Sequence, residues 1–310
     1  MSSYSHTLLP WLVFNSGVGF MLALDLGFFH KKAHLPSYTE ALLWSFVWLA
    51  FAVIFGGWIA YDQGVDCSLL FFTGYAIEKS LSLDNIMVFA IVFQTLKIPN
   101  DYQHRVLFWG IITALLLRLV MIWGGVILLQ KFHFLLYIFG VILILTGIKI
   151  LYLGDRETDL RQTWAWKNMQ KFLPLKDNLY GHKFTVKEAG KTYGTPLLAA
   201  LIIIEFSDIV FALDSIPAIF AITQDPFIIY TANVFAILGL RSLYFLLANA
   251  MADLRFLKKG LAVILCFVGL KMLGVINIQT QHSLFVILII LGGAVLASVY
   301  FKGKRWRLDS

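Results

Sequence analysis

The chain contains the stretch Glu205-Phe206-Ser207-Asp208-Ile209-Val210-Phe211-Ala212-Leu213-Asp214-Ser215-Ile216-Pro217, in which three carboxylates and a proline interrupt an apolar run. The whole run, 196–223, is long enough to cross a bilayer, because a spanning helix needs about 20 residues. A charged side chain at bilayer depth costs about 2.5–3.5 kcal/mol on insertion scales. Three acids in one span therefore need compensating partners or a function.

The composition around this stretch is that of a membrane protein. Of the 310 residues, 59% are hydrophobic and only 14% are charged, and the mean hydropathy is +0.79. Soluble domains carry about 25% charged residues. We therefore expect an all-α polytopic protein whose residues 1–310 form a single transmembrane domain. The nine predicted spans are 8–29, 41–60, 68–94, 105–129, 133–153, 195–222, 227–250, 257–276 and 283–301.

The basic residues between these spans predict the orientation. Alternate connections hold nineteen Lys and Arg residues, and the other set holds only Lys131. Because basic loops stay in the cytoplasm, the N-terminus is predicted outside and the C-terminus inside. The net charge of +7 is then mostly a topology signal, and no nucleic-acid partner is expected. The one long inside loop, 154–194, has spacings that fit an amphipathic helix and a small hairpin.

The charged landmarks of the spans occur twice in the same order. A pair of acids six residues apart comes first, then an arginine, then a Gly-x-Lys sequence. The two sets are Glu78, Asp84, Asn85, Arg118 and Lys149, and Asp208, Asp214, Ser215, Arg241 and Lys271. Each set covers three spans, an odd number, so the second copy must run in the opposite direction. The sequence thus predicts an inverted repeat, an architecture common in secondary transporters.

The acids and bases in the spans nearly balance in number. Asp25 and Glu205 add to the acids of the repeat, and Lys79 adds to its bases. We expect the bases to balance the acids, and Lys149 and Lys271 equally fit a purely structural role. Either Asp25 or Glu205 could be a further ligand or a proton carrier, since neither has a place in the repeat.

The paired acids offer oxygen ligands to a cation. The predicted metal ligands are Glu78, Asp84, Asn85, Asp208, Asp214 and Ser215. Oxygen ligands suit hard cations such as Mg²⁺, Ca²⁺ and Mn²⁺. Residues six apart on a straight helix lie about 120° apart, so either the helices break or the acids serve different places along a path. Pro217 favours a break, because it cannot donate a hydrogen bond to the Leu213 carbonyl.

No catalytic motif for nucleotide, acyl or metallohydrolase chemistry is visible, so we expect no enzyme and no prosthetic group. Two function classes remain. The chain is a secondary transporter that exports a divalent cation, or a membrane scaffold or assembly factor whose buried charges only fix helix pairing.

Several stretches resemble the TerC family of membrane proteins, and most closely its Alx branch. They are 23–26, 72–85, 205–220 and 235–241, which include the segment Asp214-Ser215-Ile216-Pro217-Ala218-Ile219. The resemblance implies a nine-helix protein of the bacterial inner membrane, linked to tellurite resistance by name and to manganese export by function. It also implies Glu78, Asp84, Asp208 and Asp214 as functional acids and Mn²⁺ as the transported ion. The side chains by themselves predict only that the ion is a hard divalent cation, so Ca²⁺ is an alternative to Mn²⁺. The oligomeric state remains open.

Overall fold

The computed structural model describes residues 8–27, 37–153, 174–176, 178–188, 190–247 and 255–306. Some side chains within these ranges lie outside the description, among them those of Asp25, Asp84 and Asp214. The helices are α1 (Leu8–Gly27), α2 (Tyr38–Gln63), α3 (Val65–Thr95), α4 (Asn100–Lys131), α5 (Leu135–Leu153), α7 (Pro196–Phe220), α8 (Pro226–Leu238), α9 (Leu240–Leu247), α10 (Arg255–Met272) and α11 (Thr280–Trp306). Two strands, β1 (Thr185–Glu188) and β2 (Lys191–Gly194), complete the described elements.

The prediction of an all-α polytopic protein is confirmed. Each of the nine predicted spans coincides with a helix, except that 227–250 is divided into α8 and α9 at Gly239. Six described helices are long and apolar enough to cross a membrane. Large apolar side chains such as Leu116 and Ile289 are exposed on their outer faces, as expected of helices whose solvent is lipid.

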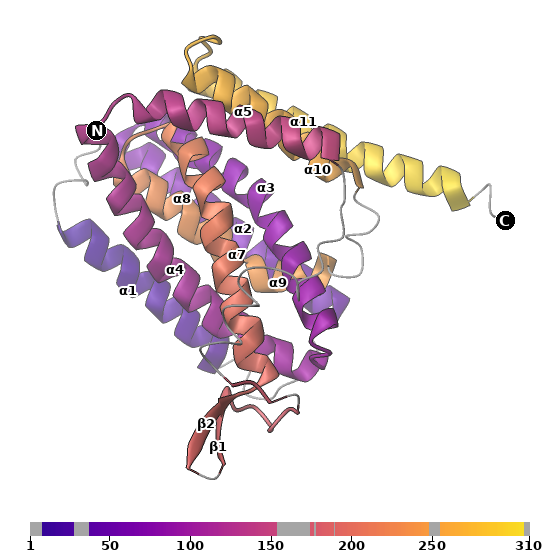
Figure 1. Ribbon diagram of the computed structural model, residues 1–310. Coiled ribbons are helices and arrows are strands. Elements are labelled where there is room, and N and C mark those ends of the chain that lie inside the picture. Colours follow the sequence, from indigo (N-terminus) through magenta and orange to yellow (C-terminus); the bar gives the residue numbers. More distant parts are fainter. Residues whose placement is uncertain are drawn as a thin grey trace.

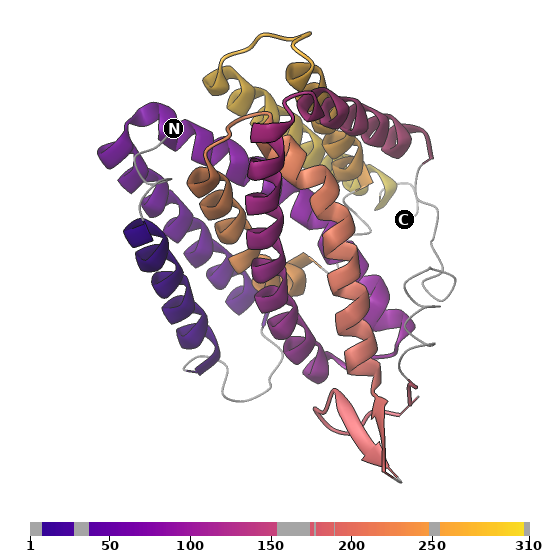
Figure 2. The same ribbon diagram turned by 60° about the vertical axis from the view of Figure 1, so that its left-hand side comes forward.

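The centre of the molecule is built from α3, α4, α7 and α8 (Figures 1 and 2). Every residue of α8 is buried, so this helix is enclosed by its neighbours. The pair α5 and α10 lies at one end of the molecule with α11 beside it, while α1 lies at the opposite edge (Figure 1). The polar residues of the inner helices are therefore shielded from lipid on several sides.

The crossing of α5 and α10 has the reciprocal contacts of a two-fold axis. A Cβ atom at Gly147 would lie 2.6 Å from the Ala262 carbonyl oxygen, and one at Gly269 would lie 2.7 Å from the Gly140 carbonyl oxygen. In the repeat, Gly147 corresponds to Gly269 and Gly140 to Ala262, so a two-fold rotation relates one contact to the other. The helices run antiparallel and their backbones nearly touch, which only small residues permit. This packing is what an inverted repeat requires.

The predicted hairpin is confirmed at the end of the molecule beyond α7 (Figure 2). Its strands are antiparallel, with Thr185 opposite Gly194 and Glu188 opposite Lys191. Glu188 accepts a hydrogen bond from Tyr180 at 3.0 Å and pairs with Lys176 at 2.7 Å. The bond from Lys176, then that from Tyr180, lowers the pKa of Glu188 below its ordinary value. The predicted amphipathic helix falls at 154–173, outside the described residues.

The predicted helix break at Pro217 is wrong. The helix α7 continues through Pro217 to Phe220, and α3 is also unbroken along its length. A proline removes one hydrogen bond and adds one steric conflict, and here the helix ends only three residues later. The other alternative therefore remains, in which the acids serve different places along a path: positions 78 and 84, like 208 and 214, are rotated about 120° apart around the axes of straight helices.

Candidate functional site

A buried arginine gathers polar residues from both halves of the repeat. Arg118 on α4 forms an ion pair with Glu78 on α3, and its Nη2 atom lies 3.0 Å from Oδ1 of Asp208 on α7. Its Nε donates to Oδ2 of Asp208 at 3.3 Å, and its Nη1 donates to Oδ1 of Asn233 on α8 at 2.7 Å. Asn85 on α3 donates its amide proton to Asp208 at 2.9 Å. The five residues thus form one network across four helices.

The network is deeply buried, and its charges do not cancel. Arg118 is 2% exposed and Glu78 is 0% exposed. The rigid guanidinium fork can serve two carboxylates and an amide at once, which a lysine ammonium cannot do in this geometry. One cation facing two carboxylates leaves the network with a net negative charge when both acids are ionised. Glu78 and Asp208 are therefore both held by Arg118.

Two neutral side-chain oxygen atoms, at equivalent positions of the two halves, have no hydrogen-bond partner among the described residues. They are Oδ1 of Asn85 and Oγ of Ser215, whose residues are 3% and 1% exposed. They occupy equivalent positions in the two halves, and each directly follows an aspartate, Asp84 or Asp214. Buried polar atoms are nearly always satisfied, because leaving one without a partner costs about 1–3 kcal/mol. Each half of the repeat therefore has a buried oxygen atom with free lone pairs at the same position.

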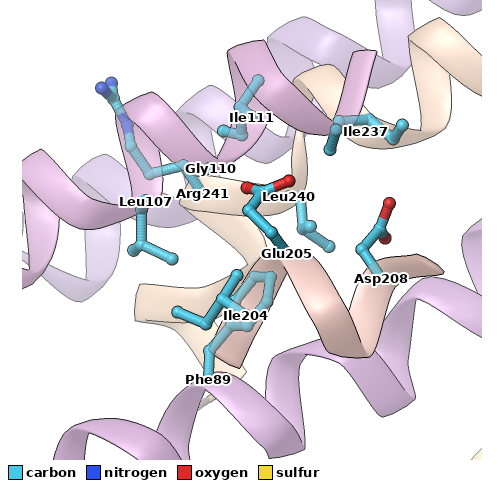
Figure 3. Close-up of a pocket in the computed structure, with 11 residues that line it drawn as sticks. Phe89, Leu107, Gly110, Ile111, Ile204, Glu205, Asp208, Ile237, Leu240 and Arg241 are labelled. Carbon is cyan, nitrogen blue, oxygen red and sulfur yellow. The ribbon is translucent and has the colours of Figure 1, made fainter. Parts of the chain in front are cut away.

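Glu205 lies in a separate small cavity between α3, α4, α7, α8 and α9 (Figure 3). The cavity measures about 20 Å³, room for about one water molecule, and Asp208 also lines it. Neither carboxylate oxygen of Glu205 accepts a hydrogen bond by distance and angle within the described part. The Thr113 hydroxyl interacts with this carboxylate, but it donates to the Trp109 carbonyl at 2.7 Å. Glu205 therefore adjoins the Arg118 network without joining it.

The other predicted charge-balancing residues have different surroundings. Lys79 donates to the carbonyl oxygen of Ala236 at 3.0 Å, and Lys271 donates to the Ser283 hydroxyl at 2.9 Å. Arg241 contacts Nε2 of His104 at 3.0 Å among its interactions. Lys149 is exposed on α5, and its role in balancing the acids stays a prediction. A residue on the outer face of a helix meets lipid or headgroups, and a lysine there can extend its stem toward the interface.

The predicted ligands are only partly placed by the structure. Glu78, Asn85 and Asp208 meet in the network, and Ser215 is buried without a hydrogen-bond partner in the described part. The side chains of Asp25, Asp84 and Asp214 lie outside the description, although α1, α3 and α7 include their positions. Among the residues that are described, no three His, Cys, Asp or Glu side chains form a cluster able to hold a metal ion.

Asn233 is the functional candidate that the sequence analysis missed. Its position within the apolar span 227–250 is the available signal, because a buried amide in such a span needs a partner. Its Oδ1 accepts from Arg118, and its Nδ2 has no partner among the described residues. Fold and site together define a polytopic membrane protein whose buried charged centre draws on both halves of the chain.

The particular family follows from comparison with known sequences. A sequence model described as "Integral membrane protein TerC family" matches residues 63–306, and the chain belongs to this family. The match includes all the residues of the Arg118 network and both halves of the repeat. The resemblance seen in the sequence is thereby confirmed.

Relatives in bacteria match nearly the whole chain. An uncharacterized membrane protein of Myxococcus xanthus is 48% identical over 93% of this chain and 91% of its own length. One of Rickettsia bellii is 46% identical over 95% of this chain and 98% of its own. A protein of Photorhabdus laumondii, with the provisional name membrane-bound redox modulator Alx, is 41% identical over 88% of both chains. No solved structure matches the chain.

Proposed function

We propose that this protein is a secondary transporter that exports a hard divalent cation, Mn²⁺, through the centre of the membrane. The observation that supports the proposal is the pair of unpartnered buried oxygens, Asn85 Oδ1 and Ser215 Oγ, at equivalent positions of the two halves. Each adjoins an aspartate in sequence, so each half offers a carboxylate and a neutral oxygen. Such oxygen donors match the ligands that Mn²⁺, Mg²⁺ and Ca²⁺ accept.

The Arg118 network gives these ligands a fixed frame. Because Arg118 holds Glu78 and Asp208, we assign these two acids to positioning and electrostatics, and Asp84 and Asp214 to direct binding. Asn85 connects the two sets, since its amide donates to Asp208 while its Oδ1 remains available. A cation that binds near the network would also be attracted by its net negative charge.

The proposed direction and location rest on the loop charges. The basic connections predict a cytoplasmic C-terminus and an external N-terminus in a bacterial inner membrane. The chain has no nucleotide-binding motif, so transport would draw on an ion gradient or on the membrane potential, worth about 2.3 kcal/mol per charge per 100 mV. Manganese itself is favoured by the family resemblance, with Ca²⁺ the competing ion.

Two other functions compete with export. The first is a membrane scaffold or assembly factor, and the ion pairs of Arg118 with Glu78 and Asp208 suit it as well. The second follows from the redox name of some relatives. The two cysteines of this chain, Cys67 on α3 and Cys266 on α10, are both unpaired thiols on different helices. Replacing both by serine tests the thiol form of the redox role, and we expect manganese export to persist.

The decisive experiment measures manganese content and growth in excess Mn²⁺ in cells that depend on this protein. We expect Asp84→Asn, Asp214→Asn and Ser215→Ala to raise cellular manganese and to slow growth. Ser82→Ala is the matched control, because Ser82 is equally buried but its hydroxyl donates to the Lys79 carbonyl at 2.8 Å. Normal manganese content in both aspartate variants, at normal protein levels, would rule out export through this site. Loss of the variant proteins from the membrane would favour the scaffold.

A further inference from the structure

The break between α8 and α9 lies against a buried lysine. The helix α8 ends at Leu238, and α9 begins at Leu240. The ammonium of Lys79, which extends from α3, donates to the Ala236 carbonyl oxygen in the last turn of α8 at 3.0 Å. A Cβ atom at Gly239 would lie 3.0 Å from the same Nζ atom. The positive charge thus rests at the end of α8, and no carboxylate among the described side chains pairs with it.

A helix that ends inside a membrane requires positive charge or hydrogen-bond donors at its carbonyl end. The last carbonyl groups of α8 lack partners within the helix, and the helix dipole places a partial negative charge there. Water satisfies such groups at a protein surface, but every residue of α8 is buried. In transporters with discontinuous helices, helix ends of this polarity coordinate Na⁺ or a proton. A lysine ammonium is a compact point charge that can meet the same need.

The described residues around Lys79 offer its ammonium no other charged partner. Its neighbour Glu78 is paired with Arg118, and the described ion pairs include none for Lys79. Its side chain lines a groove of about 510 Å³ whose other lining residues are apolar except for Tyr75 and Ser80. An ammonium in such surroundings is costly unless it has strong acceptors. The end of α8 is the acceptor that the structure provides.

The two halves of the repeat differ at this point in a correlated way. The counterpart of Lys79 in the second half is Ile209, and the counterpart of the α8–α9 pair in the first half is α4. The helix α4 is continuous from Asn100 to Lys131. The broken pair α8 and α9 of the second half is therefore contacted by Lys79 from the first half. The unbroken α4 of the first half has Ile209 at the equivalent position of the second half. Lysine and break occur together.

From this geometry we propose that Lys79 is a tethered resident cation, which occupies a monovalent-cation site at the end of α8. It is a positioning residue that holds α3 against the break, and its ammonium makes the site independent of Na⁺. When the ammonium is removed and its space left open, the carbonyl end of α8 takes an alkali cation in its place. The inference concerns the packing of the broken helix and does not depend on manganese export.

The test is thermal unfolding of the purified protein in sodium chloride and in N-methyl-D-glucamine chloride of equal ionic strength. Wild type should unfold at the same temperature in both salts. Lys79→Ala, which vacates the site, should unfold at a lower temperature without Na⁺ and regain on the order of a few degrees as Na⁺ saturates. Lys79→Met fills the space without a charge, so it should be destabilised in both salts and show no such gain.

Lys271→Ala is the matched control, because Lys271 is a membrane-helix lysine that donates to a serine hydroxyl instead of a helix end. It should show no difference between the two salts. An Na⁺ response equal in Lys79→Ala and Lys271→Ala would overturn the proposal, since it would reflect a general salt effect. So would the absence of any Na⁺ response in Lys79→Ala, or a failure of that variant to yield folded protein in sodium chloride.

Discussion

Removing the Arg118 side chain should destabilise the protein more than any other single change in its buried centre. Arg118→Met keeps an apolar stem of similar shape but deletes the ion pairs with Glu78 and Asp208 and the bond to Asn233. Breaking a buried pair costs about 3–5 kcal/mol when one partner remains charged and uncompensated. Since proteins are stable by about 5–15 kcal/mol, such a loss is a large fraction of the total.

The structure also predicts which carboxylate carries more of that cost. After the loss of Arg118, Asp208 still accepts the Asn85 amide proton at 2.9 Å. Glu78 retains no hydrogen bond from the described residues and is fully buried. Neutralising Glu78 in the background of Arg118→Met should therefore restore more stability than neutralising Asp208. We expect Arg118→Met/Glu78→Gln to unfold at a higher temperature than Arg118→Met/Asp208→Asn.

The assay is thermal unfolding in detergent, followed by the fluorescence of the nine tryptophans, with Glu78→Gln and Asp208→Asn as single-variant controls. The four values for each acid form a double-mutant cycle, which isolates the coupling to Arg118. An Arg118→Met variant as stable as wild type would refute the proposed network. Equal recovery by both second changes would refute the ranking of the two acids.

Two further predictions concern packing and the hairpin. Gly147→Leu should lower the unfolding temperature and the yield, because even a Cβ atom there would lie 2.6 Å from the backbone of α10, and such overpacking costs about 1–3 kcal/mol or more. Acidification should loosen the hairpin in hydrogen exchange: the lowered pKa of Glu188 gives a stabilisation that is present above its unfolded pKa and is lost as pH falls through the folded value. Glu188→Gln should remove this pH dependence, and its persistence would assign the effect to another group.

The sequence predicted the helices well because lipid imposes a simple rule on them. A spanning segment must be apolar, long and helical, so hydropathy alone locates its ends to within a few residues. The order of the repeat could also be predicted, since its landmarks Arg118 and Arg241 are rare in such segments. Gly147 and Gly269, read only as markers in the sequence, turned out to be the contact points of α5 and α10.

The pairing of charges could not be predicted, because it depends on how the helices are rotated about their axes. A count of acids and bases cannot show that Arg118 takes Glu78 and Asp208 together, while Lys79 turns to a carbonyl group. The predicted position of the helix break, at Pro217, was wrong for a related reason. Proline is the stronger local signal, but the break at Gly239 is supported by a lysine far away in the sequence.

The close crossing of α5 and α10 has a consequence for biosynthesis. Translation delivers α5 to the membrane well before α10, with the hairpin, α7, α8 and α9 between them. Helices enter the bilayer first and associate afterwards, so until α10 arrives the face of α5 around Gly140 and Gly147 lacks the helix that covers it in the folded protein. Lipid, a chaperone or the insertion machinery must cover that surface in the interval. The final docking of α10 would then close the molecule, and truncation before this helix should leave an incompletely folded protein for cellular proteases.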